Sequence, residues 1–330
     1  MKPVFSIFTP VYNSEKYIRK CIESVISQTI KDYEWYIYDD GSTDSSYTIC
    51  REYAEKESRI TLYQGKNGTS ISEMNNFIHY AKGEYLVFID NDDYWDKHYL
   101  EKMLSHLNET NADCAISSYT LVDYKDEKLG WYTPSLNDGE ILNKTELKKR
   151  FLTTLEIEGF RWNKIYKRNV LINSNIYIEN VFPADIRFEY ALFDCVESVV
   201  LVNDKGYFYR QSSSSEVATV NIEKTKGMLE TFRNIGTKGI EEGLVIEGKY
   251  YMSWRYISAM YLRLLDNKLS KDEIRYLFKE YSWNDFIGTS IFKALHFLNT
   301  YKNKREGRIK FCIKTIYVWI NALRFGEERI

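Results

Sequence analysis

Short apolar runs alternate with amphipathic stretches over the first hundred residues of this chain. The runs are rich in β-branched and aromatic residues, which is typical of buried strands. Between the first two, apolar residues recur at helical spacing from Ile18 to Ile26, and Asn13-Ser14-Glu15 stands where it could cap that helix. Strands that alternate with helices across short links predict a parallel sheet with helices on both faces. The expected strands cover residues 4–9, 34–38, 59–63 and 85–89, and further helices are expected after Asp44 and over residues 70–81 and 95–107.

The pattern changes after residue 112. Residues 113–215 mix shorter strands and helices, including strands over 199–202 and 207–210 around an Asp204-Lys205-Gly206 turn. The Ser-rich run 211–215 predicts a boundary. Beyond it the spacing is helical, and Ser270-Lys271-Asp272-Glu273 has the form of a capping box. The sequence therefore predicts an α/β domain over residues 1–215, in halves 1–112 and 113–215, and a helical C-terminal region over residues 216–330.

Polar and acidic residues gather where the first, second and fourth strands are expected to end. The clusters are residues 9–13, 39–44 and 90–93. In a parallel sheet these ends lie along one edge, and ligands bind beyond that edge. The sequence therefore predicts one shared site. No Gly-x-Gly-x-x-Gly or Gly-x-x-x-x-Gly-Lys motif follows the first strand, which argues against a dinucleotide-binding fold and a P-loop.

The densest cluster is Asp90-Asn91-Asp92-Asp93, directly after the fourth strand. If strand geometry continues through it, Asp90 and Asp92 project to the same side. Two such carboxylates repel unless a cation lies between them, and hard oxygen ligands suit magnesium, manganese or calcium. An ion with so few protein ligands usually takes substrate phosphates as its others. The pattern indicates a nucleotide diphosphate bound through a metal, and an acidic loop that caps the next helix is the alternative.

Composition narrows the classes of function. The 330 residues carry a net charge of −2, which gives no indication of nucleic-acid binding. The five cysteines are scattered, which argues against a disulfide framework or a structural zinc site and favours a reducing compartment. We expect neither a signal peptide nor a membrane span, because the chain begins with a strand-like segment and lacks a long uncharged apolar stretch.

An ordered set of motifs resembles the family 2 glycosyltransferases, which have the GT-A fold and use nucleotide sugars. The set covers about the first 210 residues, and although each motif is weak alone, the order is specific. Two positions depart from the family: Glu73-Met74-Asn75 replaces a frequent Ala-Arg-Asn, and Ala184 precedes Asp185 where Glu is usual. The matching segments are Ser6-Ile7-Phe8-Thr9-Pro10-Val11-Tyr12-Asn13, Ser24-Val25-Ile26-Ser27-Gln28-Thr29, Tyr38-Asp39-Asp40-Gly41-Ser42-Thr43-Asp44, residues 81–93 with Asp90-Asn91-Asp92-Asp93, and Trp162-Asn163-Lys164-Ile165-Tyr166-Lys167-Arg168.

The resemblance implies transfer of a sugar, with inversion, from a nucleotide diphosphate sugar to an acceptor hydroxyl in bacterial surface polysaccharide or glycolipid synthesis. UDP is the commonest nucleotide of the family. The implied cofactor is Mn²⁺ or Mg²⁺, a Lewis acid toward the leaving diphosphate. Asp92 matches the direct metal ligand. Asp90 matches a contact to the ribose, or to the metal through water, and Asn91 lies in the same donor-binding segment. Asp93 is expected to orient the metal-binding residues without binding the metal itself.

The resemblance also assigns the nucleotide contacts. Asp40 is expected on the base, because a carboxylate accepts the N3–H of uracil or the N–H groups of guanine, and Asp39 is then expected on the ribose. The assignment within this pair stays open, as does a turn that only caps the next helix. Thr9, Pro10 and Tyr12 match groups placed against the base, where Tyr12 either stacks on it or belongs to the core.

Asp185 matches the catalytic base, with Glu179 and Glu189 as rivals and a helix cap as the alternative role. Weaker assignments to the acceptor or the diphosphate go to Trp162, Asn163, Lys164 and Arg210, with Ser213. Arg210 either pairs with the diphosphate or forms a surface salt bridge.

Two other functions stay open. One is a non-catalytic nucleotide- or carbohydrate-binding relative. The other is a nucleotidyltransferase, which the sequence favours less because no Gly-rich phosphate loop follows the first strand.

The expected partners are a nucleotide sugar and a saccharide or lipid-linked acceptor. Residues 309–325 predict an amphipathic helix with a basic flank, which either lies on an anionic membrane or packs on the protein or a second subunit. The expected location is the cytoplasm, at the inner face of the cell membrane in the first case.

Overall fold

The chain forms two compact units. The structure is a computed structural model that describes residues 2–129, 135–154, 156–211, 221–265, 268–287 and 314–321. The first unit comprises Met1–Leu147, Gly159–Asn180 and Phe188–Ser212, and the second comprises Lys148–Glu158, Val181–Arg187 and Ser213–Ile330. Two short segments of the predicted α/β half therefore belong to the second unit. The predicted Ser-rich boundary falls mostly on residues 212–215, outside the described residues.

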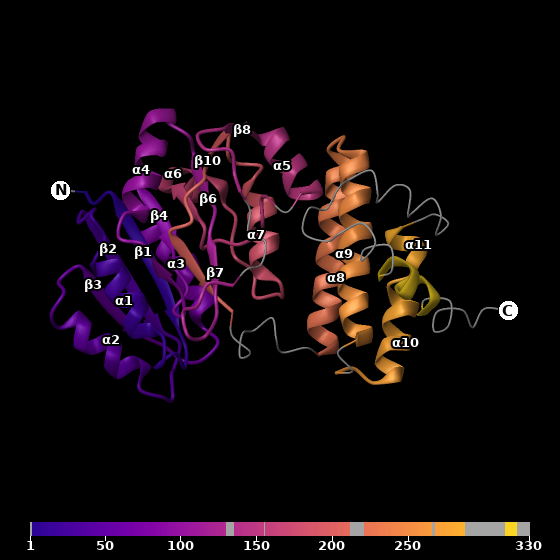
Figure 1. The fold of residues 1–330 in the computed structure, drawn as a ribbon, viewed down its shortest axis with the longest axis horizontal. Helices are drawn as coiled ribbons and strands as arrows, with labels where there is room; N and C mark the ends of the chain where they lie inside the picture. The colour runs from indigo at the N-terminus through magenta and orange to yellow at the C-terminus, as the bar shows by residue number, and fades with distance from the viewer. Residues whose placement is uncertain are drawn as a thin grey trace. The chain divides into compact units, whose positions relative to one another are not determined.

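A large mixed sheet forms the centre of the first unit (Figure 1). β1 (Phe5–Val11) pairs in parallel with β2 (Tyr33–Asp39) on one side and with β4 (Tyr85–Phe88) on the other. β2 continues in parallel to β3 (Ile60–Gln64). These strands are the four that the apolar runs predict, and the predicted parallel pairing is confirmed.

The second half of the sheet contains strands of both directions. β6 (Cys114–Ser117) and β10 (Ser198–Val202) are parallel, whereas β9 (Lys164–Lys167) runs antiparallel between β4 and β6. β8 (Ile141–Asn143) pairs antiparallel with β10 at the edge. The strand order is β3-β2-β1-β4-β9-β6-β10-β8. The sheet is therefore mostly parallel, as expected.

Helices cover both faces of this sheet, because successive side chains of each strand point to opposite faces. Ile7 of β1 belongs to the core on one face, and the ring of Phe8 lies 5.0 Å from that of Phe77 on the other. The first face carries α1 (Ile18–Ile26), α2 (Ser46–Ala54) and α4 (Tyr99–Thr110), and the second carries α3 (Ser70–Tyr80) and α6 (Arg168–Ser174).

Two helix starts differ from the sequence prediction. α1 begins at Ile18 without a side-chain cap, and the Tyr17 and Ile18 N–H groups instead donate to the backbone carbonyl oxygen of Ser14, each at 2.9 Å. α4 begins at Tyr99 rather than near Trp95, because Trp95 belongs to the short strand β5 (Tyr94–Trp95). β5 lies in a second, three-stranded sheet of order β5-β11-β7, with β11 (Tyr207–Arg210) in its centre and β7 (Thr120–Val122) at its edge.

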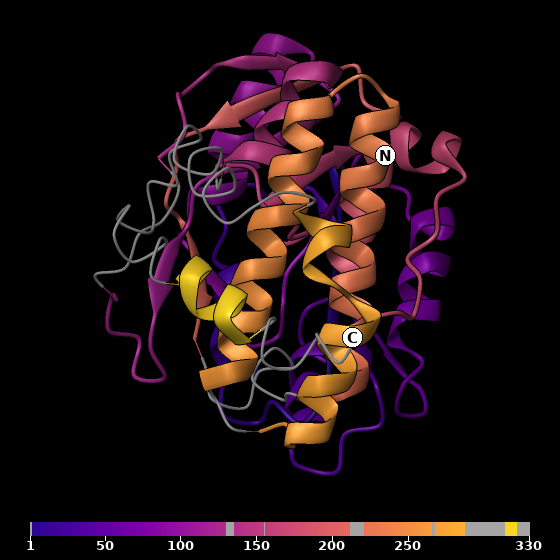
Figure 2. The same cartoon turned by 90° about the vertical axis from the view of Figure 1, so that its right-hand side faces the viewer.

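The second unit is helical, as predicted. α8 (Ile222–Glu241) and α9 (Val245–Leu265) run side by side (Figure 2). They approach closely at Gly236 and Gly248, where a Cβ on Gly248 would lie 2.4 Å from the Gly236 carbonyl oxygen. The predicted capping box is confirmed at Ser270 and Glu273, at the start of α10 (Lys271–Glu280). The remaining helices are α5 (Lys144–Thr153) and α7 (Ala184–Leu192), which each run from one unit into the other, and α11 (Trp283–Phe286).

The C-terminal amphipathic helix can be followed only in part. Residues 314–321 are helical, whereas the rest of the predicted helix over 309–325 and its basic flank lie outside the described residues. Among the helices of the described ranges, none has both the length and the apolar character needed to cross a bilayer.

Candidate functional site

The carboxyl ends of β1, β2 and β4 meet at one edge of the sheet, as their parallel pairing requires. Hydrogen bonds join the polar clusters there. The Asp40 N–H donates to the Val11 carbonyl oxygen at 2.8 Å, and Asn91 Nδ2 donates to the Pro10 carbonyl oxygen at 2.7 Å. The structure thus brings together the three clusters that the sequence places at strand ends.

The acidic cluster is a turn and not the end of a strand. β4 ends at Phe88, and the Asp93 N–H donates to the Asp90 carbonyl oxygen at 3.2 Å. The expectation that strand geometry continues through Asp90 and Asp92 is therefore wrong. In this turn, the side chains of the three aspartates do not alternate between two faces as they would in a strand.

Asp92 and Asp93 have different environments within this turn. Asp92 is partly buried, and its carboxylate accepts no hydrogen bond from another residue of the described chain. Burial raises the pKa of Asp92 above its ordinary value. Asp93 is fully buried, and its carboxylate accepts from the Tyr207 hydroxyl and from the Arg210 N–H, each at 2.7 Å. Burial, and then the charges of Asp92 and Asp90, raise the pKa of Asp93 well above its ordinary value.

The two aspartates at the end of β2 also differ in their hydrogen bonding. Both oxygens of Asp40 accept backbone N–H groups at the start of α3, from Gly68 at 3.0 Å and from Thr69 at 2.9 Å. Asp39 is fully buried, and its Oδ2 accepts from Ser42 N and Gln64 Nε2, each at 3.2 Å. In the described chain its Oδ1 is buried without a hydrogen-bond partner. Asp40 therefore holds α3, whereas Asp39 retains an acceptor that no donor satisfies.

The residues of the first strand end have distinct surroundings. Thr9 is buried and accepts a hydrogen bond from Trp35 Nε1 at 3.0 Å. Tyr12 is 46% exposed, so the interpretation of Tyr12 as a core residue is wrong. The side chain of Asn91 contacts Pro10 and Ser14, which fastens the acidic turn to β1. Tyr12 is therefore the side chain of this group that is open to a stacking partner.

Arg210 is buried and held by protein groups. It is 3% exposed, so the interpretation as a surface salt bridge is wrong. Its Nε donates to the Asp92 carbonyl oxygen at 2.8 Å and its guanidinium pairs with Asp126 at 2.5 Å. Its guanidinium also lies 4.6 Å from the ring centre of Tyr17. These contacts fix the backbone beside Asp92.

The Trp162-Asn163-Lys164 segment is buried in the fold. The Trp162 ring stacks on Tyr207 with ring centres 4.5 Å apart. Asn163 Nδ2 donates to the Ser117 carbonyl oxygen at 3.0 Å. Lys164 Nζ lies 3.8 Å from Glu189, whose other oxygen accepts from the Tyr166 hydroxyl. These contacts favour a role in holding the sheet together, and they engage Glu189, the rival candidate for the base.

Asp185 lies in the first turn of α7, on the segment Val181–Arg187 that belongs to the second unit. The segment packs on α8. Arg187 Nε donates to Thr231 Oγ1 at 2.9 Å, and a Cβ on Gly227 would lie 2.4 Å from the Phe182 carbonyl oxygen. The role of Asp185 as base stays a prediction.

A divalent cation fits the acidic turn by the chemistry of its donors. In the described parts of the chain, no three His, Cys, Asp or Glu side chains form a group that could hold a metal ion. A cation there must therefore take ligands from elsewhere, as Mg²⁺ and Mn²⁺ do from phosphate oxygens. Asp92 offers a hard, partly desolvated carboxylate without a hydrogen bond from another described residue, which is a suitable protein ligand.

The sequence analysis did not identify two contributors to this edge. Gln64 ends β3 beside Asp39, and the rule that strand ends meet could have found it. Tyr207 reaches Asp93 from more than a hundred residues away in the chain, and no local pattern indicates that contact.

A mostly parallel sheet with an acidic turn at its carboxyl edge is the arrangement of the GT-A fold. The family model described as "Glycosyl transferase family 2" matches residues 6–173, and the chain belongs to this family, which confirms the resemblance. In structure, it is similar to residues 1–349 of TarS from S. aureus in complex with UDP-GlcNAc, with a TM-score of 0.67 and 18% identity. That likeness covers 98% of this chain and 93% of the other, and it shows the fold.

Two curated relatives are similar in sequence. The glycosyltransferase GlyA of Streptococcus pneumoniae serotype 4 is 28% identical over 212 residues, which are 62% of this chain and 30% of GlyA. The uncharacterized glycosyltransferase EpsJ of Bacillus subtilis (strain 168) is 28% identical over 219 residues, which are 65% of this chain and 63% of EpsJ. The matched regions thus span less than two thirds of either relative.

Proposed function

We propose that this chain transfers a sugar from a nucleotide diphosphate sugar, with UDP as the first candidate nucleotide, to an acceptor hydroxyl with inversion at the anomeric carbon. The observation that carries the proposal is the shared carboxyl edge of β1, β2 and β4. There Asp92 has no hydrogen bond from another described residue and Asp39 Oδ1 is a buried acceptor without a donor. Membership of family 2, and the UDP-GlcNAc bound by TarS, support this donor class.

The diphosphate is proposed to bind through Mn²⁺ or Mg²⁺, with Asp92 as ligand and Asp90 beside it. When bound, the cation neutralises charge on the leaving diphosphate as a Lewis acid. The protein side of this arrangement is the partly buried Asp92 carboxylate, whose pKa is raised by burial although the charge of Arg210 partly offsets the shift. A bound cation would stabilise the charged form of this carboxylate further.

The nucleobase is proposed to bind Asp39 rather than Asp40. A buried acceptor without a donor costs on the order of 1–3 kcal/mol, and an N–H of uracil would remove that cost. Asp40 remains the alternative, but its oxygens already accept from Gly68, Thr69 and Ser70. Tyr12, which is exposed at the neighbouring strand end, is proposed to stack on the base.

The acceptor hydroxyl is proposed to lose its proton to Asp185. The residue matches the family's base. Its segment packs on α8 at two places: Arg187 donates to Thr231, and the Phe182 carbonyl oxygen lies against Gly227. An inverting displacement needs one such base. We further propose a saccharide or lipid-linked acceptor, used at the inner face of a bacterial membrane during surface polysaccharide or glycolipid synthesis.

A donor-hydrolysis screen tests the proposal. The purified chain is incubated with UDP-, GDP- and dTDP-sugars and Mn²⁺ or Mg²⁺, and the released nucleotide is measured beside Asp92→Asn. We expect release of one nucleoside diphosphate that EDTA and Asp92→Asn abolish. If calorimetry with UDP and Mn²⁺ shows no binding and the screen shows no release, the proposal is wrong.

The same screen separates the alternatives. Pyrophosphate as product would identify a nucleotidyltransferase. Binding of a nucleotide sugar without turnover in the presence of saccharide acceptors would favour a non-catalytic relative. The retained Asp92 and Asp185 argue for the enzyme.

A further inference from the structure

Strand β11 contacts the acidic turn through Tyr207 and Arg210. The Tyr207 hydroxyl donates to Asp93 Oδ2 at 2.7 Å, and the Arg210 N–H donates to Asp93 Oδ1 at 2.7 Å. Arg210 Nε donates to the carbonyl oxygen of Asp92 at 2.8 Å. A strand remote in sequence is therefore hydrogen-bonded to the turn that carries the proposed metal ligand.

The Tyr207 hydroxyl joins the two ends of this turn. It donates to the carboxylate of Asp93 and accepts from the backbone N–H of Asp90 at 3.5 Å. Within the turn, the Asp93 N–H donates to the Asp90 carbonyl oxygen. Because three carboxylates in four residues repel one another, the turn needs donors from outside to stay closed. Tyr207 supplies one of these donors.

Tyr207 itself is fixed by its surroundings. It is fully buried, and its ring stacks on Trp162 at 4.5 Å and meets Tyr99 edge-on at 5.9 Å. Its backbone pairs with Trp95 of β5. A buried tyrosine whose ring is stacked on one neighbour and met edge-on by another presents its hydroxyl at one position, which is the condition for a positioning role.

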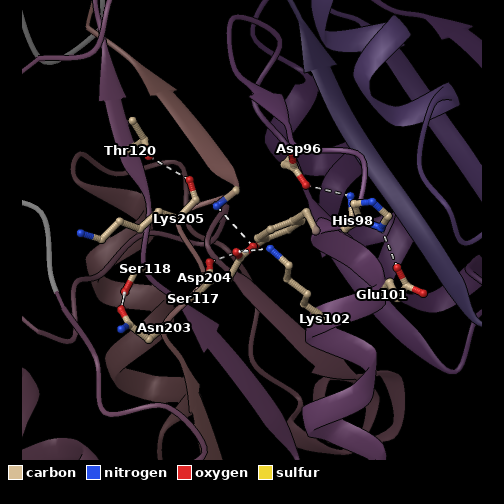
Figure 3. A network of polar contacts seen from close by, with 12 residues as sticks. Asp96, His98, Glu101, Lys102, Ser117, Ser118, Thr120, Asn203, Asp204 and Lys205 are labelled. Carbon is tan, nitrogen blue, oxygen red and sulfur yellow. Dashed lines mark hydrogen bonds and ion pairs between the residues drawn. The ribbon is translucent and has the colours of Figure 1, made fainter.

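The turn that precedes β11 is also fastened. Figure 3 shows a polar network in which Lys102 of α4 pairs with Asp204 at 2.7 Å and Thr120 of β7 donates to the Lys205 carbonyl oxygen at 2.9 Å. The Asp96 N–H donates to the Gly206 carbonyl oxygen at 2.7 Å. These contacts tie the start of β11 to the segment that follows the acidic turn.

We propose that Tyr207 is a positioning residue that holds the Asp90–Asp93 turn in the shape in which Asp92 binds the cation and the donor diphosphate. This inference rests on the proposed function and deepens it. Tyr207 does not touch the reacting atoms. It acts through Asp93, the residue that follows the proposed ligand Asp92 in the turn. Hydrogen-bonded groups outside the ligand shell orient the ligands of other metal sites in the same way.

The test is Tyr207→Phe, which removes the hydroxyl and keeps the ring. The matched control is Tyr99→Phe, which removes another buried hydroxyl from the same aromatic cluster, the one that bonds Ser117 Oγ at 3.0 Å. Free Mn²⁺ is measured by electron paramagnetic resonance in the presence of UDP. We expect the Mn²⁺ dissociation constant to rise about tenfold or more in Tyr207→Phe and to change less than about twofold in Tyr99→Phe.

A kinetic readout separates positioning from general loosening. In Tyr207→Phe we expect the KM for Mn²⁺ to rise, while kcat at saturating Mn²⁺ returns to within about threefold of wild type. Asp93→Asn, which alters the acceptor and leaves the ring cluster intact, should weaken Mn²⁺ in the same direction. It serves as the second variant if Tyr207→Phe does not fold.

Three outcomes would overturn the inference. Wild-type Mn²⁺ affinity in Tyr207→Phe and Asp93→Asn would show that the contact does not position the ligand. An equal loss in Tyr99→Phe would assign the effect to the aromatic cluster as a whole. A wild-type protein that binds UDP but no Mn²⁺ would overturn the metal part of the proposed function together with the inference, whereas Mn²⁺–UDP binding with unaltered variants would overturn the inference alone.

Discussion

Adjacent aspartates in this chain have different surroundings, and these surroundings indicate different tasks. Asp40 accepts backbone N–H groups at the start of α3, as a helix-capping carboxylate does. Asp39, one residue earlier, keeps a buried oxygen without a donor. Asp93 is bound on both oxygens, whereas Asp92 accepts from no other described residue. At each place one carboxylate is held by hydrogen bonds within the fold, and its neighbour keeps an oxygen that accepts from no other described residue.

The aspartate pair of β2 gives the first prediction. Asp40→Ala should lower the free energy of unfolding by about 1–2 kcal/mol, because α3 loses its capping acceptor. Asp39→Asn should weaken UDP at least about tenfold while changing stability less, because the amide offers the base a donor where an acceptor is needed. Urea unfolding and calorimetry with UDP measure the two effects. If Asp40→Ala loses UDP binding and Asp39→Asn keeps it, Asp40 and not Asp39 contacts the base.

The raised pKa of Asp92 gives a pH prediction for the metal-free protein. A folded-state pKa above the ordinary value means that the folded protein binds the proton more tightly than the unfolded chain. The free energy of unfolding therefore falls as the pH rises from the ordinary aspartate pKa through the raised one. Asp92→Asn removes this penalty and lowers the charge next to Asp93, which acts in the same direction.

In EDTA, we therefore expect Asp92→Asn to be more stable than wild type at neutral pH and the two to converge as the pH falls to about 4. Thermal unfolding across this range measures the difference. A difference that grows on acidification would contradict the assignment. Adding Mn²⁺ and UDP should reverse the order at neutral pH, because only the wild type gains from the cation.

Within each unit, two elements approach each other closely beside a residue with a proposed role. In the first unit, β11 lies between β5 and β7 and reaches the acidic turn through Tyr207 and Arg210. In the second unit, α8 approaches the segment of Asp185 at Gly227, where no side chain fits beside the Phe182 carbonyl oxygen. Both contacts involve segments that are remote from each other in sequence.

Gly227→Ala tests the second of these contacts. In an exposed helix this change would stabilise by about 1 kcal/mol. Here the new Cβ would lie 2.4 Å from the Phe182 carbonyl oxygen, so the segment Val181–Arg187 must shift. A displacement of about 1 Å at a catalytic base costs on the order of 100-fold in rate, so we expect kcat to fall by that order.

Asn234→Ala, on the exposed side of α8, is the control and should leave turnover unchanged. Turnover with the donor identified in the screen measures both variants. Normal kcat in Gly227→Ala would show that the segment of Asp185 does not set the rate. UDP binding should be retained in both variants, because the proposed donor contacts lie at the edge of β1, β2 and β4.

At the scale of the whole molecule, the chain contains an α/β unit with the proposed donor site and a helical unit whose residues include Asp185. Ligand binding should stabilise the unit that holds the site by mass action. At a concentration about 100 times the dissociation constant, UDP with Mn²⁺ should add about 2.7 kcal/mol to the free energy of unfolding. Differential scanning calorimetry measures this shift.

Two controls define this prediction. UDP in EDTA, and UDP with Mn²⁺ added to Asp92→Asn, should each give a clearly smaller shift. An equal shift in all three conditions would show that nucleotide binding does not depend on the cation. No shift in the wild type would contradict the donor site itself.

The sequence by itself determined much of this protein. The four strands from Phe5 to Phe88 and the meeting of three polar clusters at one edge follow from local apolar patterns and from the rule that parallel strands end together. The family follows from the resemblance of an ordered set of motifs. The errors at Trp95 and in the strand geometry of Asp90 and Asp92 arose where a distant partner replaced a local preference. Trp95 pairs with Tyr207, and Tyr207 and Arg210 donate to Asp93.

Only the tertiary structure decided which carboxylates accept hydrogen bonds from other residues of the protein. Hydrogen bonding and burial depend on groups far apart in the chain, so sequence spacing does not distinguish Asp39 from Asp40 or Asp92 from Asp93. The burial of Arg210 and Trp162 and the contact of Tyr207 with Asp93 follow from the packing of β11 against the rest of its unit. Local pattern sets where strands and turns occur, and long-range packing sets which of their side chains remain available for a ligand.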